Sequence, residues 1–188
     1  TDYVFDGNNC IPYKESDEVN PIGVYGKTKR IGELAVLNSD IDGIVIRTSW
    51  LYSSYANNFV KTMLNLSEKR STLSVVADQV GGPTPAKDIA RACLQIVEQL
   101  KQDPSKSGTY HFSGIEDLSR ADLATEIFQQ TGRSVHVLPI PTSEYPTSAV
   151  RPLNSRLNCS KTQEVFSIHR PDWQIGLNDI LNELGVIR

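Results

Sequence analysis

Apolar residues recur at helical spacing in several segments of the chain. Between residues 24 and 38, the apolar positions Ile31, Leu34 and Ala35 fall on one face of a helix, and a longer apolar stripe follows over residues 85–102. Three further segments are predicted to be helical, namely residues 57–70, 119–132 and 172–184. Polar residues fill the opposite faces, so these helices are expected to cover a core on one side and to meet water on the other.

Small polar residues and glycine mark the ends of two of these helices. Asn57 or Asn58 is placed to cap one helix, and Ser119 is placed to cap another, because a short side-chain oxygen can accept a hydrogen bond from a free backbone N–H. Gly132 fits the C-terminal end of the helix that Ser119 begins, since glycine readily adopts the left-handed conformation that closes helices. These residues predict where the two helices start and stop.

Short runs rich in β-branched and apolar residues lie between the helices. The segment "GIVIRTSWLY", residues 43–52, begins with Ile44, Val45 and Ile46, which is typical of a strand buried on both faces of a parallel sheet. Other predicted strands cover residues 2–5, 73–78, 108–114 and 135–140, and "GGPT", residues 81–84, is predicted to be a turn. Strands that alternate with helices predict an α/β fold with parallel pairing.

The composition is that of an ordinary globular chain. Of the 188 residues, 39% are hydrophobic and 22% are charged, which is enough to bury a core. A net charge of −3 gives no reason to expect nucleic acid or a membrane surface as a partner, and no apolar run reaches membrane-spanning length. Cys10, Cys93 and Cys159 form no C-x-x-C pair, which favours buried, reduced thiols and a cytoplasmic location.

The segment "VYGKTKRIGE", residues 24–33, places Tyr25 and Lys29 four positions apart in one predicted helix. Side chains at i and i+4 share a helix face, so both can reach the same point. A nearby ammonium favours the ionised form of a phenol, whose ordinary pKa is about 10, and so makes the phenol a better proton donor. Such a pair suits the transfer of a proton to a carbonyl oxygen while a hydride reaches the carbon. A surface pair with this spacing by chance is the alternative.

Several other motifs accompany this pair in a fixed order. They are "TDYVFDG", "VYGKTK", "IRTSWLY", "NNFVKTM", "DQVGGPT", "VRPLNSRLNCSK" and "PDWQIGLNDIL". Together they resemble the extended short-chain dehydrogenase/reductase superfamily and, within it, the dTDP-4-dehydrorhamnose reductase family, over almost the whole chain. The resemblance implies an NADPH-dependent or NADH-dependent enzyme of dTDP-rhamnose biosynthesis. It would reduce the C4 ketone of dTDP-6-deoxy-L-lyxo-4-hexulose to give dTDP-L-rhamnose.

The resemblance also assigns roles to particular residues. The catalytic set of the family matches Thr1, Tyr25 and Lys29, and the cofactor-binding positions match Tyr25 and Lys29, whose ammonium would hold the nicotinamide ribose. Substrate contacts match Thr1, Asp2 and Trp50. Trp50 follows a predicted strand, where ligands gather in open α/β sheets, although a core aromatic is the alternative for this position.

Three further positions are candidate substrate contacts with ordinary alternatives. Tyr3 lies next to the proposed site and could pack on a sugar or base, or serve as a strand tyrosine. Asn58 precedes a helix whose N-terminus could receive a diphosphate, or it caps that helix. Arg151 could clamp phosphate or tie down a loop through an ion pair. The three histidines, His111, His136 and His169, show no metal-ligand spacing, so we interpret them as structural or surface residues.

The glycine fingerprint that the family uses for the cofactor pyrophosphate, G-x-x-G-x-x-G, appears nowhere in the sequence. The opening "TDYVFDG" is typical of a strand that enters a turn. We therefore expect a fragment that is inactive alone and carries only the latter part of a Rossmann-like, doubly wound parallel sheet. That part would comprise residues 1–52 and 85–114, and a smaller α/β substrate-binding lobe would comprise residues 53–84 and 115–188.

Two alternative functions remain open at this stage. The regulatory subunit of methionine adenosyltransferase resembles these reductases in the "YGKTK" region but serves as a binding partner. Another nucleotide-sugar reductase or epimerase is the nearer alternative. A Mg²⁺ ion is expected from the family resemblance alone. The expected partners are a dTDP-linked nucleotide sugar and a second copy of the chain in a homodimer.

Overall fold

The structure is a computed structural model that describes residues 1–145, 147 and 149–187. Its α-helices are α1 (Val24–Leu37), α2 (Phe59–Ser67), α3 (Ala86–Gln102), α4 (Arg120–Gln130), α5 (Ser160–Phe166) and α6 (Trp173–Glu183). Short 3₁₀ turns are η1 (Asp2–Val4), η2 (Pro104–Lys106) and η3 (Thr142–Glu144). The strands are β1 (Ile44–Arg47), β2 (Leu51–Tyr52), β3 (Thr72–Val76), β4 (Val80–Gly81), β5 (Thr84–Pro85), β6 (Gly108–His111), β7 (Leu118–Ser119), β8 (His136–Ile140) and β9 (Asn154–Ser155).

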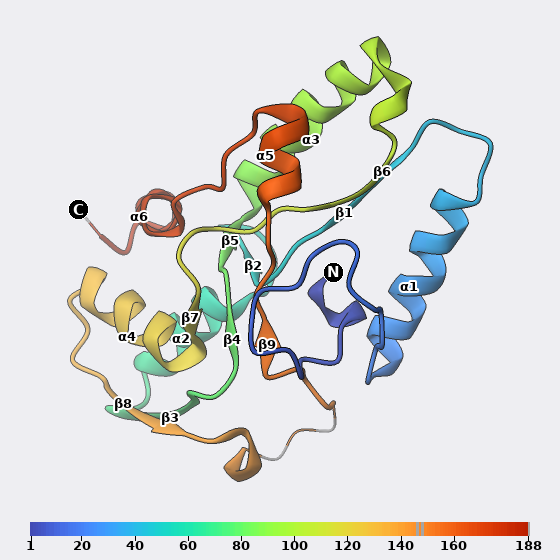
Figure 1. Cartoon of the computed structure of the whole chain (residues 1–188). Helices are drawn as coiled ribbons and strands as arrows, with labels where there is room; N and C mark the ends of the chain where they lie inside the picture. The colour runs from blue at the N-terminus through green and yellow to red at the C-terminus, as the bar shows by residue number, and fades with distance from the viewer. Residues whose placement is uncertain (146, 148, 188) are drawn as a thin grey trace.

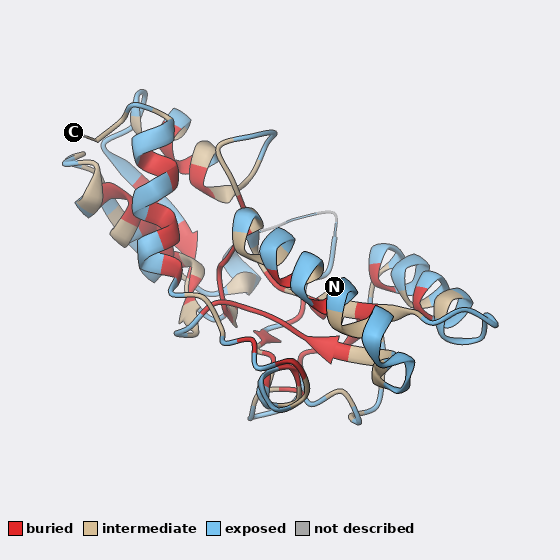
Figure 2. Ribbon diagram, turned by 90° about the horizontal axis from the view of Figure 1, so that it is seen from above, coloured by how far each residue is buried: buried red, intermediate tan, exposed pale blue. Residues whose placement is uncertain are grey.

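Strand pairing is mostly parallel, as the alternation of strands and helices predicts. β1 pairs with β6, β2 with β5, and β3 with β8, all in parallel. β4 lies between β9, a parallel neighbour, and β7, an antiparallel one. The helices lie outside these strands (Figure 1), and buried residues follow the strands that cross the middle of the molecule (Figure 2). The predicted α/β class is confirmed.

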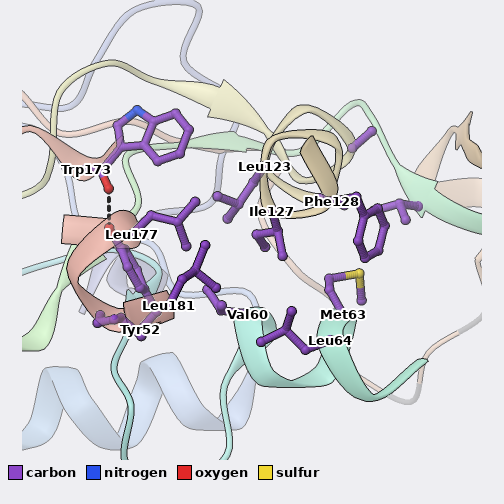
Figure 3. Packing of buried hydrophobic residues seen from close by; sticks show 14 of the residues in the cluster. Tyr52, Val60, Met63, Leu64, Leu123, Ile127, Phe128, Trp173, Leu177 and Leu181 are labelled. Atoms are coloured by element: carbon purple, nitrogen blue, oxygen red, sulfur yellow. Dashed lines mark hydrogen bonds between the residues drawn. The ribbon is translucent and has the colours of Figure 1, made fainter. Parts of the chain in front are cut away.

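The largest core cluster joins α2, β3, α4 and α6 (Figure 3). Its fully buried members include Val60 on α2, Ile127 on α4, and Leu177 and Leu181 on α6. These residues come from segments far apart in the sequence, so burying them together fixes how the helices pack. At the edge of the cluster, the Tyr52 hydroxyl donates a hydrogen bond of 2.6 Å to the Trp173 carbonyl oxygen, which satisfies both polar groups inside the core.

Two smaller clusters stabilise the other half of the molecule. One packs α3 and β6 against Phe166 and Ile168, which belong to α5 and the residue stretch after it. The other surrounds Phe5 and Tyr13, whose rings stack at 4.2 Å between centroids. The predicted division of the chain into a sheet part and a smaller lobe stays a prediction. Helix α5 falls in the predicted lobe but packs against α3 and β6 of the predicted sheet part.

All five predicted helices form, with bounds within three residues of the expected positions, and two of their caps are informative. Asn58 caps α2, since its side-chain oxygen accepts from the Lys61 amide at 3.2 Å. Ser119 caps α4 and forms a capping box with Asp122. The C-cap of α4 is Thr131, one residue before the predicted Gly132, which follows with a left-handed φ of +62°.

Several expectations about local structure are wrong. Residues 2–4 form the 3₁₀ turn η1 and not a strand, because the Thr1 hydroxyl caps the turn and accepts from the Tyr3 amide. The predicted strand over residues 43–52 is broken, since Trp50 takes a left-handed φ of +50° between β1 and β2. The "GGPT" segment contributes to β4 and β5 on either side of Gly82 and Pro83.

Two further features differ from the sequence analysis. Helix α5 was not predicted, because its seven residues are too few for a clear helical period. Cys10 is exposed and Cys93 is half-buried, whereas Cys159 is buried as expected. Among the described residues, no helix combines the length and the apolar character needed to cross a membrane.

Candidate active site

Helix α1 and turn η1 touch at Gly26. A Cβ atom at this position would lie only 2.1 Å from the Tyr3 carbonyl oxygen, so any side chain would force the two segments apart. Next to this contact, the rings of Tyr3 and Tyr25 meet edge to face with centroids 5.8 Å apart. The Asp2 amide donates to the Thr48 carbonyl oxygen at 3.0 Å, which fastens η1 beyond the end of β1. Tyr25 is thereby held beside the first residues of the chain.

A cavity of about 660 Å³ opens at this junction. Its lining includes all three predicted catalytic residues, Thr1, Tyr25 and Lys29, together with Asp2 and Trp50. Tyr25 is 54% exposed, so its hydroxyl can be reached from the solvent. The Lys29 ammonium lies 5.6 Å from the centroid of the Tyr25 ring, which places both side chains on the cavity side of α1. The structure thus brings the predicted catalytic set to one open site.

An internal ion pair anchors the helix that carries Tyr25 and Lys29. Glu33, one turn beyond Lys29, accepts two hydrogen bonds of 2.9 Å from Arg47 on β1 and a third from Arg30. Glu33 and Arg47 are only 6% and 2% exposed. Burial opposes ionisation of Glu33, but hydrogen bonds and charge from the two arginines outweigh it and lower the pKa of this carboxyl. The bidentate pair fixes the rotation of α1.

Asp2 is a buried carboxyl at the floor of the cavity. Burial raises its pKa, which favours the protonated form. The Thr1 hydroxyl donates a hydrogen bond of 3.2 Å to the Asp2 Oδ1 atom. Within the described residues, the Oδ2 atom has no hydrogen-bond partner. Asp2 is therefore coupled directly to the hydroxyl group that is predicted to contact the substrate.

Trp50 owes its position to its backbone and to two neighbours. Its φ of +50° turns the half-buried indole away from the path of β1 and into the cavity lining. Gly81 leaves room for it, because a Cβ atom there would lie 2.8 Å from the Trp50 Cε2 atom. The Arg120 guanidinium stacks over the indole, with Cζ 3.6 Å from the ring centroid.

Arg120 is a candidate site residue that the sequence analysis missed. It is the first residue of α4, where an arginine in the sequence is ordinarily a solvated surface charge. The structure instead places it half-buried between the rings of Trp50 and Phe59. Burial lowers its pKa to about 10, so the guanidinium stays charged at neutral pH. No local sequence pattern signals this position, because it depends on how α4 docks against Trp50.

A second cavity of about 620 Å³ adjoins the first. The two share four lining residues, which are Tyr3, Trp50, Leu51 and Arg120. The second cavity also takes in Arg151 and Arg70, and none of its described lining residues is acidic. Tyr3 and Arg151 thus line the same cavity, which adjoins the first one.

Asn58 lies outside both cavities. Its amide nitrogen donates to the Ser53 carbonyl oxygen at 2.7 Å while its oxygen caps α2, so both ends of the side chain are occupied. The structure therefore supports the capping alternative for Asn58. His111 is buried and structural, and the other two histidines are exposed. The described residues include no cluster of His, Cys, Asp or Glu that could hold a metal ion, so the expected Mg²⁺ gains no support.

The parallel α/β fold with a Tyr-x-x-x-Lys helix at an open cavity defines the class as a Rossmann-like, extended short-chain dehydrogenase/reductase fold. Comparison with known proteins identifies the family. A model of the family described as "RmlD substrate binding domain" matches residues 1–186. The chain belongs to this family, which confirms the resemblance to dTDP-4-dehydrorhamnose reductases.

Individual relatives agree with this assignment. The dTDP-4-dehydrorhamnose reductase of Sinorhizobium fredii is 44% identical over 180 residues, which cover 93% of this chain and 61% of that protein. A solved structure of a dTDP-4-dehydrorhamnose reductase from Clostridium acetobutylicum is similar with a TM-score of 0.89 and 40% identity, covering 98% of this chain and 64% of that one. A Bacillus anthracis reductase solved in complex with NADP has a TM-score of 0.86 and 37% identity, covering 97% and 63%. The chain spans less than two thirds of the length of these relatives.

Proposed function

We propose that the protein reduces the C4 ketone of dTDP-6-deoxy-L-lyxo-4-hexulose to give dTDP-L-rhamnose, with NADPH as the reductant. One observation carries the proposal: Thr1, Tyr25 and Lys29 line a single open cavity that adjoins a second cavity, whose described lining includes arginines and no acidic residue. A keto sugar fits the first cavity, and a negatively charged nucleoside diphosphate fits the second. The names of the similar proteins support the same reaction.

The roles of the residues follow from their chemistry. Tyr25 holds the proton that its Oη atom delivers to the ketone oxygen as the carbon is reduced. The Lys29 ammonium lies 5.6 Å from the centroid of the Tyr25 ring, so its positive charge offsets the negative charge that the proton transfer leaves on Tyr25. Thr1 donates a hydrogen bond to the same ketone oxygen. The raised pKa of Asp2 supports this role, since in its protonated form Asp2 can donate the bond that it otherwise accepts from Thr1 and so free the threonine hydrogen for the substrate.

The side chains of the first cavity fit the nicotinamide end of NADPH. The Lys29 ammonium forms no ion pair within the described part of the chain, so its donors are available for ribose hydroxyls. Gly32 leaves the adjoining wall open, with no atom within 4 Å of a Cβ placed there. When bound, NADPH supplies the hydride. A relative solved with NADP supports NADPH over NADH.

Turnover by the complete gene product tests the proposal. The substrate is incubated with NADPH, NADPH consumption is followed by absorbance, and the product is identified by mass spectrometry as the keto sugar plus two hydrogens. We expect stoichiometric conversion of the dTDP-linked ketone and little conversion of a UDP-linked one. Absence of turnover, together with capture of methionine adenosyltransferase, would favour the regulatory alternative. Preference for a UDP-sugar would favour another reductase or epimerase. The homodimer and the cytoplasmic location stay predictions.

A further inference from the structure

The Arg120 guanidinium occupies the boundary between the two cavities. It lines both of them, together with Tyr3, Trp50 and Leu51. A substrate whose ketone reaches Tyr25 in the first cavity and whose nucleotide lies in the second must cross this boundary. The part of a nucleotide sugar that follows the sugar ring is the diphosphate. Arg120 thus stands where the doubly charged group of such a ligand would pass.

The contacts of Arg120 leave several of its hydrogen-bond donors available, since its side chain hydrogen-bonds with that of Tyr3, which uses only part of its five N–H groups. Its flat face is covered by the Trp50 indole at 3.6 Å and lies 5.2 Å from the Phe59 ring centroid. Stacking uses the face of a guanidinium, whereas its five N–H donors point outward in the plane. Among the described residues, Arg120 forms no ion pair, and Asp2 shares its hydrogen bond with Thr1. A half-buried cation without an acidic partner at a cavity wall is suited to receive an anion.

The other cations of the second cavity are arranged differently. Arg70 and Arg151 are both exposed, so water screens their charges. Arg120 is the partly desolvated member of the set, and a charge-assisted hydrogen bond is strongest where water is excluded. It is also held in place on two rings, so little side-chain freedom remains to be lost when an anion binds.

We propose that Arg120 is a substrate-binding residue that contacts the diphosphate of the nucleotide sugar directly, while its stacked face holds the Trp50 indole against the sugar. This inference rests on the proposed function and adds a residue to it. The alternative is a purely structural role for Arg120, in which the guanidinium would only support Trp50.

Binding of dTDP and of thymidine distinguishes these two roles, because the nucleoside lacks the diphosphate. The complete gene product and its Arg120→Gln variant are titrated with each compound by calorimetry. We expect Arg120→Gln to weaken dTDP about 10- to 100-fold, in keeping with the loss of a charge-assisted hydrogen bond, and to change thymidine less than about twofold. Arg91→Gln is the control, since Arg91 is exposed on α3, pairs with Asp88, and lines neither cavity.

Equal weakening of dTDP and thymidine would overturn the proposal in favour of a structural role, and unchanged affinity for both would overturn it outright. If Arg120→Gln does not fold, Arg120→Lys keeps the charge but loses the planar fork, and we expect a selective loss for dTDP of about 3- to 10-fold. These titrations need no turnover. A selective loss without reductase activity would refute the proposed reaction alone, and normal activity with unchanged dTDP affinity would refute the role of Arg120 alone.

Discussion

The helix that carries Tyr25 and the core around α6 are held in place in opposite ways. On α1, only Gly26 and Glu33 are buried, and the helix is fixed by a close backbone approach and an ion pair. On α6, five residues are buried, and Leu177 and Leu181 are completely enclosed by apolar neighbours from α2 and α4. Directional polar contacts fix the first helix, whereas non-directional apolar burial fixes the second.

This difference suits the two regions to different tasks. Apolar burial supplies most of the folding free energy but tolerates small adjustments in position. A bidentate ion pair contributes little net stability, yet it specifies one orientation because its hydrogen bonds need defined geometry. A helix that must aim a proton donor at a ligand benefits from the second kind of contact. We expect a substitution at Glu33 to affect both stability and catalysis, and a substitution in the core to affect stability alone.

The largest effect on stability is expected at the ion pair. Glu33→Gln leaves Arg47 buried without a counter-charge, and breaking such a pair costs about 3–5 kcal/mol. Glu98→Gln is the matched control, because Glu98 pairs with Lys101 at 2.9 Å on an exposed helix face, where a pair contributes about 0–1 kcal/mol. Urea unfolding of both variants measures the difference. Similar costs would show that the Glu33–Arg47 pair is not the anchor described here.

Substitution in the core should lower stability without a selective effect on the site. Leu177→Ala removes a fully buried side chain and is expected to cost about 2–5 kcal/mol. Ile175 lies on the same helix and is 64% exposed, so Ile175→Ala should cost less than about 0.5 kcal/mol. In the folded Leu177→Ala protein, the Michaelis constants should stay within about twofold of wild type. A large rise in them would mean that the core also positions the site.

Buried His111 should make stability depend on pH. Its Nδ1 atom faces the Tyr13 carbonyl oxygen at 3.1 Å, and its Nε2 atom faces Arg47 at 3.5 Å, so the neutral ring satisfies both neighbours. Burial and the Arg47 charge lower the pKa of His111 to about 3. Because the unfolded state binds this proton near the ordinary pKa of about 6.5, acid favours unfolding, and the stabilisation is complete above that pH.

Between pH 3 and 6.5, His111 should therefore contribute a slope of up to about 1.4 kcal/mol of stability per pH unit. The His111→Gln variant should show a flatter dependence than wild type in urea unfolding across this window. His169→Gln, at an exposed position, should leave the slope unchanged. An unchanged slope in His111→Gln would show that protonation of this ring is not coupled to unfolding.

Much of the fold was predictable because its signals are local and repeated. The amphipathic stripe of α3 and the cap at Ser119 are properties of a few neighbouring residues. η1 and the break at Trp50 were not predictable in this way. Each depends on contacts with distant segments, such as the hydrogen bond from Asp2 to Thr48 and the space left by Gly81.

The same contrast between local sequence signals and contacts of distant segments applies to the site. The four-residue spacing of Tyr25 and Lys29 determines that both face one cavity, so the pair could be predicted from the sequence. The capping by Asn58 was foreseen as an alternative, and the structure favours it. The ion pair of Glu33 with Arg47 and the stacking of Arg120 on Trp50 join residues 14 and 70 positions apart, a link that no local pattern contains.

The most direct test of this account is the turnover number of the Tyr25→Phe variant of the complete gene product, because the substitution removes one hydroxyl group and keeps the ring. The account predicts a loss of about 10²- to 10⁴-fold, the usual contribution of a positioned proton donor. Tyr55→Phe is the control, since Tyr55 is 80% exposed and lines neither of the two cavities, and it should retain wild-type turnover. Wild-type turnover in Tyr25→Phe would contradict the assignment of Tyr25 as the proton donor.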